Sequence, residues 1–167
     1  GTSDSIWFRS RIVNCTVILS WCKLLRILRS EYLPEWLKYF GRAFSSMHQY
    51  RSGAYCYLGT VENPDILVVV ADFFTRVHGL KWVAICGVYN DTVVVIFRGD
   101  GHLDLGAFAA SRLGGFGNAG GHRALARAEF PLSATEGRSV DVFVYRKLTE
   151  TPQKKKEAPD EPEAAEA

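Results

Sequence analysis

The chain has 167 residues, of which 47% are hydrophobic, and a formal net charge of +2. This allows one domain with a substantial core, or a domain with a helical appendage. It excludes a bilayer-spanning segment, because Asn14, Thr16, Ser20 and Lys23 interrupt the most apolar stretch, residues 12–28.

The first 50 residues have the spacing of helices. Apolar residues over 15–29 predict a helix with a wide buried face. Ser30 is a candidate N-cap for a second helix, which we expect to run to about Tyr50 and to include His48. Together they predict an N-terminal helical arm.

The central part alternates between strand and helix patterns. We expect strands over 53–62, 81–89 and 92–98, with the turn at Asn90-Asp91. Helices are expected over 63–79, 103–114 and 137–148. The predicted fold class is therefore α/β, with a mixed sheet of about four or five strands flanked by helices and preceded by the arm.

The C-terminal residues 150–167 differ in composition from the rest. They contain three lysines, six acidic residues and three prolines, and no aromatic residue. Such a segment cannot bury enough apolar surface to fold, so we predict a disordered tail. Its charge of −3 leaves +5 on residues 1–149, which would suit an anionic ligand without requiring one.

The four cysteines, Cys15, Cys22, Cys56 and Cys86, form no C-x-x-C pair, and no histidine completes a zinc pattern. We therefore expect reduced, buried thiols and an intracellular, cytoplasmic protein. The motifs of a two-metal phosphoesterase are also absent, since the chain has no D-x-D and no D-H-H, and it has no Walker loop.

A glycine-rich stretch ends in two side chains that can carry positive charge. Asn118 is followed by Ala119, Gly120, Gly121, His122 and Arg123. Glycines let backbone N–H groups approach an anion, and a helix beginning near His122 would add unpaired N–H groups and its dipole. The sequence leaves two interpretations open, a phosphate site or a flexible connection.

Arg98 is the second candidate for anion binding. It ends an apolar strand and precedes Gly99-Asp100-Gly101, a position that suits the edge of a site or a solvated strand end. Asp72 is an unusual carboxylate within an apolar run, and we expect it to cap or pair locally rather than act in catalysis.

The stretch "FGNAGGHRALA" resembles the glycine-glycine-histidine signature of the DHH-associated domain, the C-terminal substrate-binding domain of bacterial DHH-family phosphoesterases such as RecJ-like exonucleases and nanoRNases. The resemblance extends over about Tyr50 to Leu132. More loosely, "GTSDSIWFRS" resembles the end of the catalytic DHH domain, where Asp4 would be its last metal ligand. Phe97 and Arg127 depart from the family pattern, which often has a serine before the arginine and a small glycine pair after the signature.

The resemblance implies a division into three parts. Residues 1–50 would be the end of the catalytic domain and a helical linker, 51–149 the DHH-associated domain, and 150–167 the tail. It implies that a catalytic domain, missing from this chain, holds two Mn²⁺ or Mg²⁺ ions. The phosphate of a short oligonucleotide or nucleotide would then bind at Gly120, Gly121, His122, Arg123, Arg98 and Asn118.

Without the metal motifs this chain alone is expected to be inactive and to hold no cofactor, although the full-length protein would be a hydrolase. The alternative is a non-catalytic module that binds nucleic acid or nucleotides. A further alternative is an oligomerisation domain, because exposed apolar residues on the arm would favour a homodimer. No membrane partner is expected.

Overall fold

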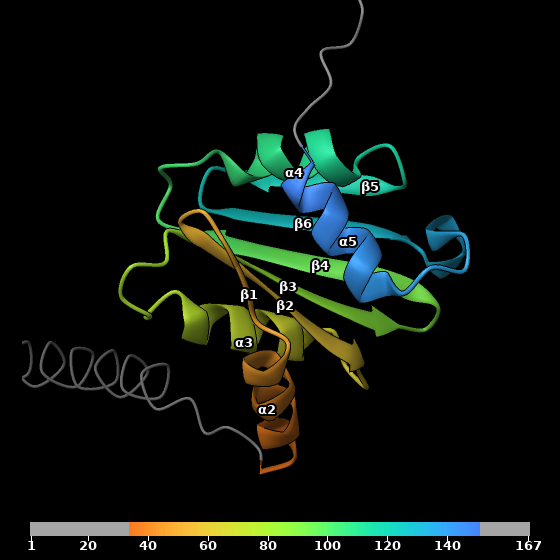
Figure 1. The fold of residues 1–167 in the computed structure, drawn as a ribbon, viewed down its shortest axis with the longest axis horizontal. Helices are drawn as coiled ribbons and strands as arrows, with labels where there is room; N and C mark the ends of the chain where they lie inside the picture. The colour runs from red at the N-terminus through yellow and green to blue at the C-terminus, as the bar shows by residue number, and fades with distance from the viewer. Residues whose placement is uncertain (1–33, 151–167) are drawn as a thin grey trace, which may run out of the picture. The chain divides into compact units, whose positions relative to one another are not determined.

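The computed structural model describes residues 34–150 of the chain (Figure 1). The chain divides into two compact units, residues 1–38 and residues 39–167, and the strands of the described part all belong to the second. Asp4, the helix expected over 15–29, Cys15, Cys22 and the tail from residue 151 lie outside the described residues. No helix within 34–150 is long and apolar enough to cross a membrane.

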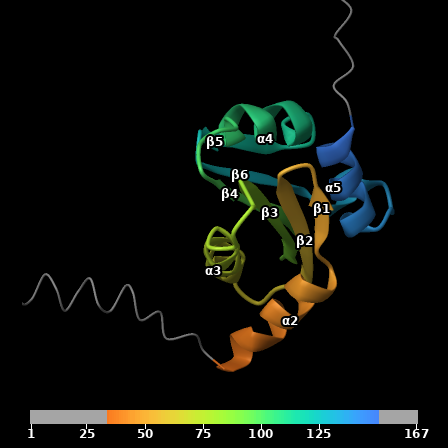
Figure 2. The same cartoon turned by 60° about the vertical axis from the view of Figure 1, so that its left-hand side comes forward.

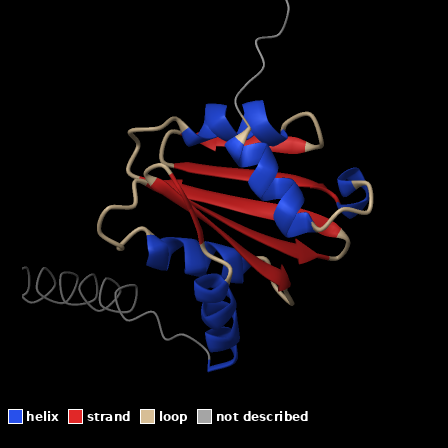
Figure 3. Cartoon of the chain, in the orientation of Figure 1, coloured by secondary structure: helices blue, strands red, loops and turns tan. Residues whose placement is uncertain are grey.

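The described residues alternate between helices and strands, as Figure 3 shows by colour. In chain order the elements are η1 (Pro34–Trp36), α2 (Leu37–Ser45), β1 (His48–Tyr50), β2 (Gly53–Thr60), α3 (Asp65–Phe74), β3 (Trp82–Tyr89), β4 (Thr92–Gly99), α4 (Leu105–Leu113), β5 (Asn118–His122), β6 (Leu125–Pro131), η2 (Leu132–Thr135) and α5 (Val140–Thr149).

The strands form one mixed sheet in the order β1-β2-β3-β4-β6-β5. Strands β2 and β3 are parallel, and every other neighbouring pair is antiparallel. The predicted α/β class with a mixed sheet is confirmed. The sheet has six strands rather than four or five, because short β1 and β5 extend its two edges.

Helix α3 makes the crossover that two parallel neighbouring strands require. The Asn63 Oδ1 atom accepts a hydrogen bond from the Asp65 backbone N–H at 2.8 Å, which satisfies one donor of the first turn. The helix buries Ile66, Leu67 and Val70 against β3 and β4 on one face of the sheet.

Helices α4 and α5 pack on the opposite face, and Figure 2 shows α3 and α5 on the two sides of the strands. The core on this side includes Phe97 of β4, Leu105 of α4, Phe130 of β6 and Phe143 of α5. Both faces of β3 are therefore covered, which explains its run of seven buried residues.

Strands β3 and β4 are joined by the predicted two-residue turn. Asn90 and Asp91 have φ angles of 45° and 57°, as a type I′ turn requires. The chain reverses there without a gap, so the pairing continues from Tyr89↔Thr92 to Trp82↔Gly99. This register fixes which β4 side chains face α3.

The helix expected to run to Tyr50 is shorter. Helix α2 ends at Ser45, and His48–Tyr50 forms β1. The Ser46 hydroxyl donates to the Tyr57 carbonyl at 2.8 Å and accepts from the Tyr57 N–H at 3.0 Å, so this residue is tied to β2. The apolar spacing that predicted a helix to about Tyr50 carries no information about this contact between Ser46 and a residue eleven positions away.

The two cysteines in the described part are free and buried, as predicted. Burial raises the pKa of Cys56 to about 12, and burial also raises the pKa of Cys86 to about 12. Both thiols therefore stay protonated, and chemically inert, at neutral pH.

Candidate functional site

The glycine-rich stretch is an edge strand, not a loop before a helix. Residues Asn118–His122 form β5, which pairs antiparallel with β6 from Asn118↔Glu129 to His122↔Leu125. No helix begins at His122, because a two-residue turn leads directly into β6. A helix dipole therefore contributes nothing at this position, and any anion would meet side chains and the strand edge.

The register places the candidate residues in rows across the sheet. His122 lies opposite Leu125, and Leu125 lies opposite Arg98 on the other side of β6. Directly opposite residues of an antiparallel pair share one face, so His122 and Arg98 point to the same side. Two strand spacings separate their backbones, a distance of about 10 Å.

Gly120 and Asn118 occupy the same face in the neighbouring rows, since side chains of one face recur every second residue. Gly120 lies opposite Arg127, and Asn118 lies opposite Glu129. The sheet thus brings together four of the six residues singled out in the sequence, which are Arg98, Asn118, Gly120 and His122.

This face is uncovered over β5 and β6. Along β6, Ala126, Ala128 and Phe130 are buried, whereas Leu125 and Arg127 are exposed. Helix α3 covers the same side of the sheet at β3 and β4. We call the uncovered part the open face: the α3 side of β5 and β6, with Arg98 at its border.

Arg98 is held at this border by Asp72, the unusual carboxylate noted in the apolar run of the sequence. Its Nε atom lies 2.9 Å from Oδ1 of Asp72 in α3, and 23% of the Arg98 side chain is exposed. The Nε atom is buried and its N–H is not aligned on that oxygen, so the contact is an ion pair rather than a directed hydrogen bond.

No other hydrogen bond or ion pair within residues 34–150 engages the Arg98 guanidinium. The two terminal Nη groups are the atoms with which arginine makes bidentate contacts to phosphate. Because Asp72 approaches the Nε side, both groups are left to a ligand.

The turn that follows His122 is fixed by its neighbours. The Arg123 carbonyl accepts from the Leu105 N–H, and the Ala124 carbonyl accepts from the Gly99 N–H, both at 3.0 Å. The Arg123 Nε donates to the Gly101 carbonyl at 3.3 Å. His122 is therefore an exposed side chain on a backbone that is tied to both α4 and β4.

The two adjacent glycines serve opposite faces. A Cβ atom on Gly120 would meet nothing within 4 Å, so this position leaves room on the open face. A Cβ atom on Gly121 would meet the Leu125 carbonyl oxygen and the Ala126 Cα atom. One on Gly106 of α4 would meet the backbone of Gly121, so the close approach of α4 to β5 accounts for Gly106, whereas the contact of β5 with β6 accounts for Gly121.

Arg127 is a cation of the open face that the sequence analysis treated only as a departure from the family. Its Nε donates to Glu129 Oε1 at 2.7 Å within β6. Both side chains are about half exposed, so the pair adds little to stability. The alternation of "LARAEFP" would have revealed it, since every second residue there is small or aromatic.

Within residues 34–150, no group of three or more His, Cys, Asp or Glu side chains could hold a metal ion. His102 and Asp100, near the turn, pair with each other at 3.0 Å between Nδ1 and Oδ2. The backbone N–H of His102 lowers the pKa of Asp100. The described part offers cations and hydrogen-bond donors, which suit binding of an anion.

Comparison with known proteins gives one curated relative, which is longer than this chain. No protein-family model matches. An uncharacterized protein of Methanocaldococcus jannaschii is 33% identical over 98 residues, which cover 58% of this chain and 20% of that protein. The chain therefore spans about a fifth of the length of this curated relative.

Among solved structures, an exopolyphosphatase-related protein from Bacteroides fragilis is similar with a TM-score of 0.62 and 15% identity, over 89% of this chain and 43% of that one. This likeness shows that the two chains share a fold. A pGpG-specific phosphodiesterase from Vibrio is similar at a TM-score of 0.42 and 11% identity, over 65% of this chain and 37% of that one.

Proposed function

We propose that this chain is the substrate-binding part of a DHH-type phosphoesterase, and that its open face binds the phosphate of a short oligonucleotide or a nucleotide. The observation that carries the proposal is the row His122–Leu125–Arg98. It sets a histidine and an arginine with free Nη groups about 10 Å apart on one uncovered face.

The chemistry of this row suits a phosphate better than a carboxylate. Arginine forms two parallel hydrogen bonds with phosphate oxygens, and the neighbouring Arg127, although paired with Glu129, is still about half exposed. Gly120 leaves the space beside Arg127 empty, so a bulky sugar-phosphate can approach the sheet. The description of the B. fragilis protein as exopolyphosphatase-related is in keeping with a phosphate ligand.

The catalytic ions belong elsewhere in this proposal. The DHH domain would supply Mn²⁺ or Mg²⁺, which activate a water molecule for attack on phosphorus. The open face would face that cytoplasmic catalytic domain and would hold the phosphate or nucleotide that is not being cleaved. The residues of this chain would thus set affinity and position, and would not take part in bond breaking.

The proposal is tested by titrating inorganic phosphate and a short oligonucleotide against the 167-residue chain, followed by NMR or calorimetry. We expect Arg98→Ala and His122→Ala each to weaken oligonucleotide binding about tenfold, as loss of a charged hydrogen-bond partner implies. Arg138→Ala is the matched control, because Arg138 is an exposed arginine paired with Glu136 beyond the other end of β6.

Equal binding by all three variants would remove the phosphate site. A different result would favour a non-catalytic nucleic-acid-binding module. In that case the chain would bind long single strands through Arg98, and no hydrolysis would occur when a catalytic DHH domain and Mn²⁺ are supplied.

A further inference from the structure

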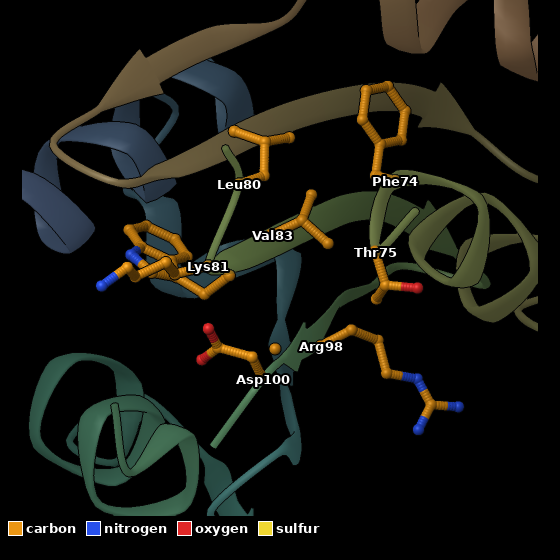
Figure 4. Close-up of a pocket in the computed structure, with 9 residues that line it drawn as sticks. Phe74, Thr75, Leu80, Lys81, Val83, Arg98 and Asp100 are labelled. Atoms are coloured by element: carbon orange, nitrogen blue, oxygen red, sulfur yellow. The ribbon is translucent and has the colours of Figure 1, made fainter. Parts of the chain in front are cut away.

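A small cavity opens beside Arg98, outside the row of residues that would hold a phosphate (Figure 4). Its volume is about 120 Å³, and it lies between the end of α3 and the adjoining ends of β3 and β4. The lining residues that matter for binding are Phe74, Leu80, Lys81, Val83, Arg98 and Asp100.

The inner part of the cavity is apolar. Phe74 and Val83 are almost completely buried, at 2% and 1% exposure, and Leu80 is half-buried. In Figure 4 the side chains of Leu80, Val83 and Phe74 lie along one side of the space. An apolar ring would be favoured here, because it would pack against these side chains and lose its own contact with water.

The rim is polar and asymmetric. In Figure 4 the Arg98 side chain extends along one side, with its guanidinium pointing out of the cavity, and Lys81 and Asp100 lie toward the other side. The two parts of the Arg98 side chain therefore serve different sites. Its aliphatic part forms a wall of the cavity, and its guanidinium faces Asp72 and the open face.

Asp100 is fixed in place as an acceptor. Its Oδ1 accepts from the His102 backbone N–H at 3.0 Å, and its Oδ2 lies 3.0 Å from His102 Nδ1. Each carboxylate oxygen can still accept a second hydrogen bond. A ring that carries an amino group would meet this acceptor at the rim, whereas a ring that presents a carbonyl oxygen there would be repelled.

We propose that this cavity receives the base of the nucleotide whose phosphate is bound at Arg98, and that it selects a single-ring base bearing an amino group, as in cytosine. The inference rests on the proposed phosphate site and adds a base preference to it. A cavity of about 150 Å³ accommodates benzene, so this cavity of about 120 Å³, which opens to solvent at its rim, could take the inner part of one ring and has no room for two fused rings.

The experiment compares four ligands on the 167-residue chain: ribose 5-phosphate, CMP, UMP and AMP. Stacking and burial of one ring add about tenfold in affinity, so CMP should bind about tenfold more tightly than ribose 5-phosphate. CMP should also bind more tightly than UMP, which has a carbonyl oxygen in place of the amino group. It should bind more tightly than AMP, which has two fused rings.

Two variants assign these differences to the cavity. Leu80→Trp fills the space and should reduce the affinity for CMP to that for ribose 5-phosphate. Leu132→Trp is the control and should leave the affinity for CMP unchanged, because Leu132 is a half-buried residue in a hollow at the far end of the sheet. Asp100→Asn keeps the shape of an exposed side chain and should abolish the preference for CMP over UMP.

The outcomes separate this inference from the proposed function. Equal binding of CMP and ribose 5-phosphate, both weakened by Arg98→Ala, would overturn the base pocket and leave the phosphate site intact. Tighter binding of AMP than CMP, or an unchanged CMP preference in both Leu80→Trp and Asp100→Asn, would also overturn it. Failure of every ligand, ribose 5-phosphate included, would overturn both.

Discussion

The two faces of the sheet differ most at its β5 edge. On the α4 side, Gly106 lets the helix pack directly against the backbone of Gly121, and Gly121 itself packs against Leu125 and Ala126 of β6. On the other side, Gly120 faces open space beside Arg127. The same residue type thus closes one face and keeps the other open, which means that counting glycines in a sequence does not reveal a ligand site by itself.

The largest expected effect distinguishes these two glycines. Gly121→Ala places a methyl group against the Leu125 carbonyl and Ala126 at a φ of +151°, so we expect the free energy of unfolding to fall by about 3 kcal/mol. Gly120→Ala, its matched control, should change it by less than about 0.5 kcal/mol. Chemical denaturation measures both, and similar losses would contradict the contrast between the faces.

The next prediction concerns two cysteines buried in the sheet. Cys86 packs in the core under α4 and α5, and Cys56 is buried in β2. Because burial raises both folded pKa values to about 12, above those of the unfolded chain, unfolding releases protons at alkaline pH. The stabilisation is complete below about pH 8.5, the ordinary thiol pKa, and is lost as the pH rises toward the folded value.

Between about pH 8 and about pH 10.5 we therefore expect the free energy of unfolding to fall by about 2 kcal/mol or more. Replacement of both cysteines by alanine should flatten this dependence when denaturation curves are compared at the two pH values, leaving the part contributed by Tyr55, whose pKa burial also raises. An unchanged slope in the double variant would show that the thiols are hydrated.

A third prediction concerns the empty space on the open face. Gly120→Val adds a branched side chain opposite Arg127, which a strand accepts well, so folding should be retained. Phosphate or oligonucleotide affinity should fall about tenfold because the approach to Arg127 and His122 is blocked. Calorimetric titration measures this, and unaltered affinity would place the ligand elsewhere.

The smallest expected effect is at Asp72. Its ion pair with Arg98 is half exposed, so Asp72→Asn should change stability by less than about 1 kcal/mol. Removal of the negative charge should tighten phosphate binding about threefold, an effect that diminishes in high salt. Weaker binding in this variant would instead show that Asp72 is needed to hold Arg98 in position.

Much of the fold could be predicted because its signals are local. The Asn90-Asp91 turn, the Asn63-Pro64 start of α3 and the apolar runs of β3 and β4 each lie within a few residues. The end of α2 could not be predicted, because it depends on hydrogen bonds between Ser46 and Tyr57 of the next strand.

The candidate site divides in the same way. Arg98 could be singled out because it ends an apolar strand, and His122 because it follows two glycines. Their shared face could not, because it follows from the register of β4, β6 and β5 rather than from any spacing along the chain. Neither interpretation of the glycine-rich stretch included a strand, because glycine permits an extended edge strand as readily as a flexible connection.

The register of β5 also limits how this protein can change by insertion and deletion. Side chains alternate along a strand, so one residue inserted between Asn118 and Gly120 would turn every earlier position to the opposite face or force a bulge. The turn beyond His122 cannot absorb the shift, because Leu105 and Gly99 both hydrogen-bond to it. We expect natural variants to accept many substitutions in this strand but to keep its length.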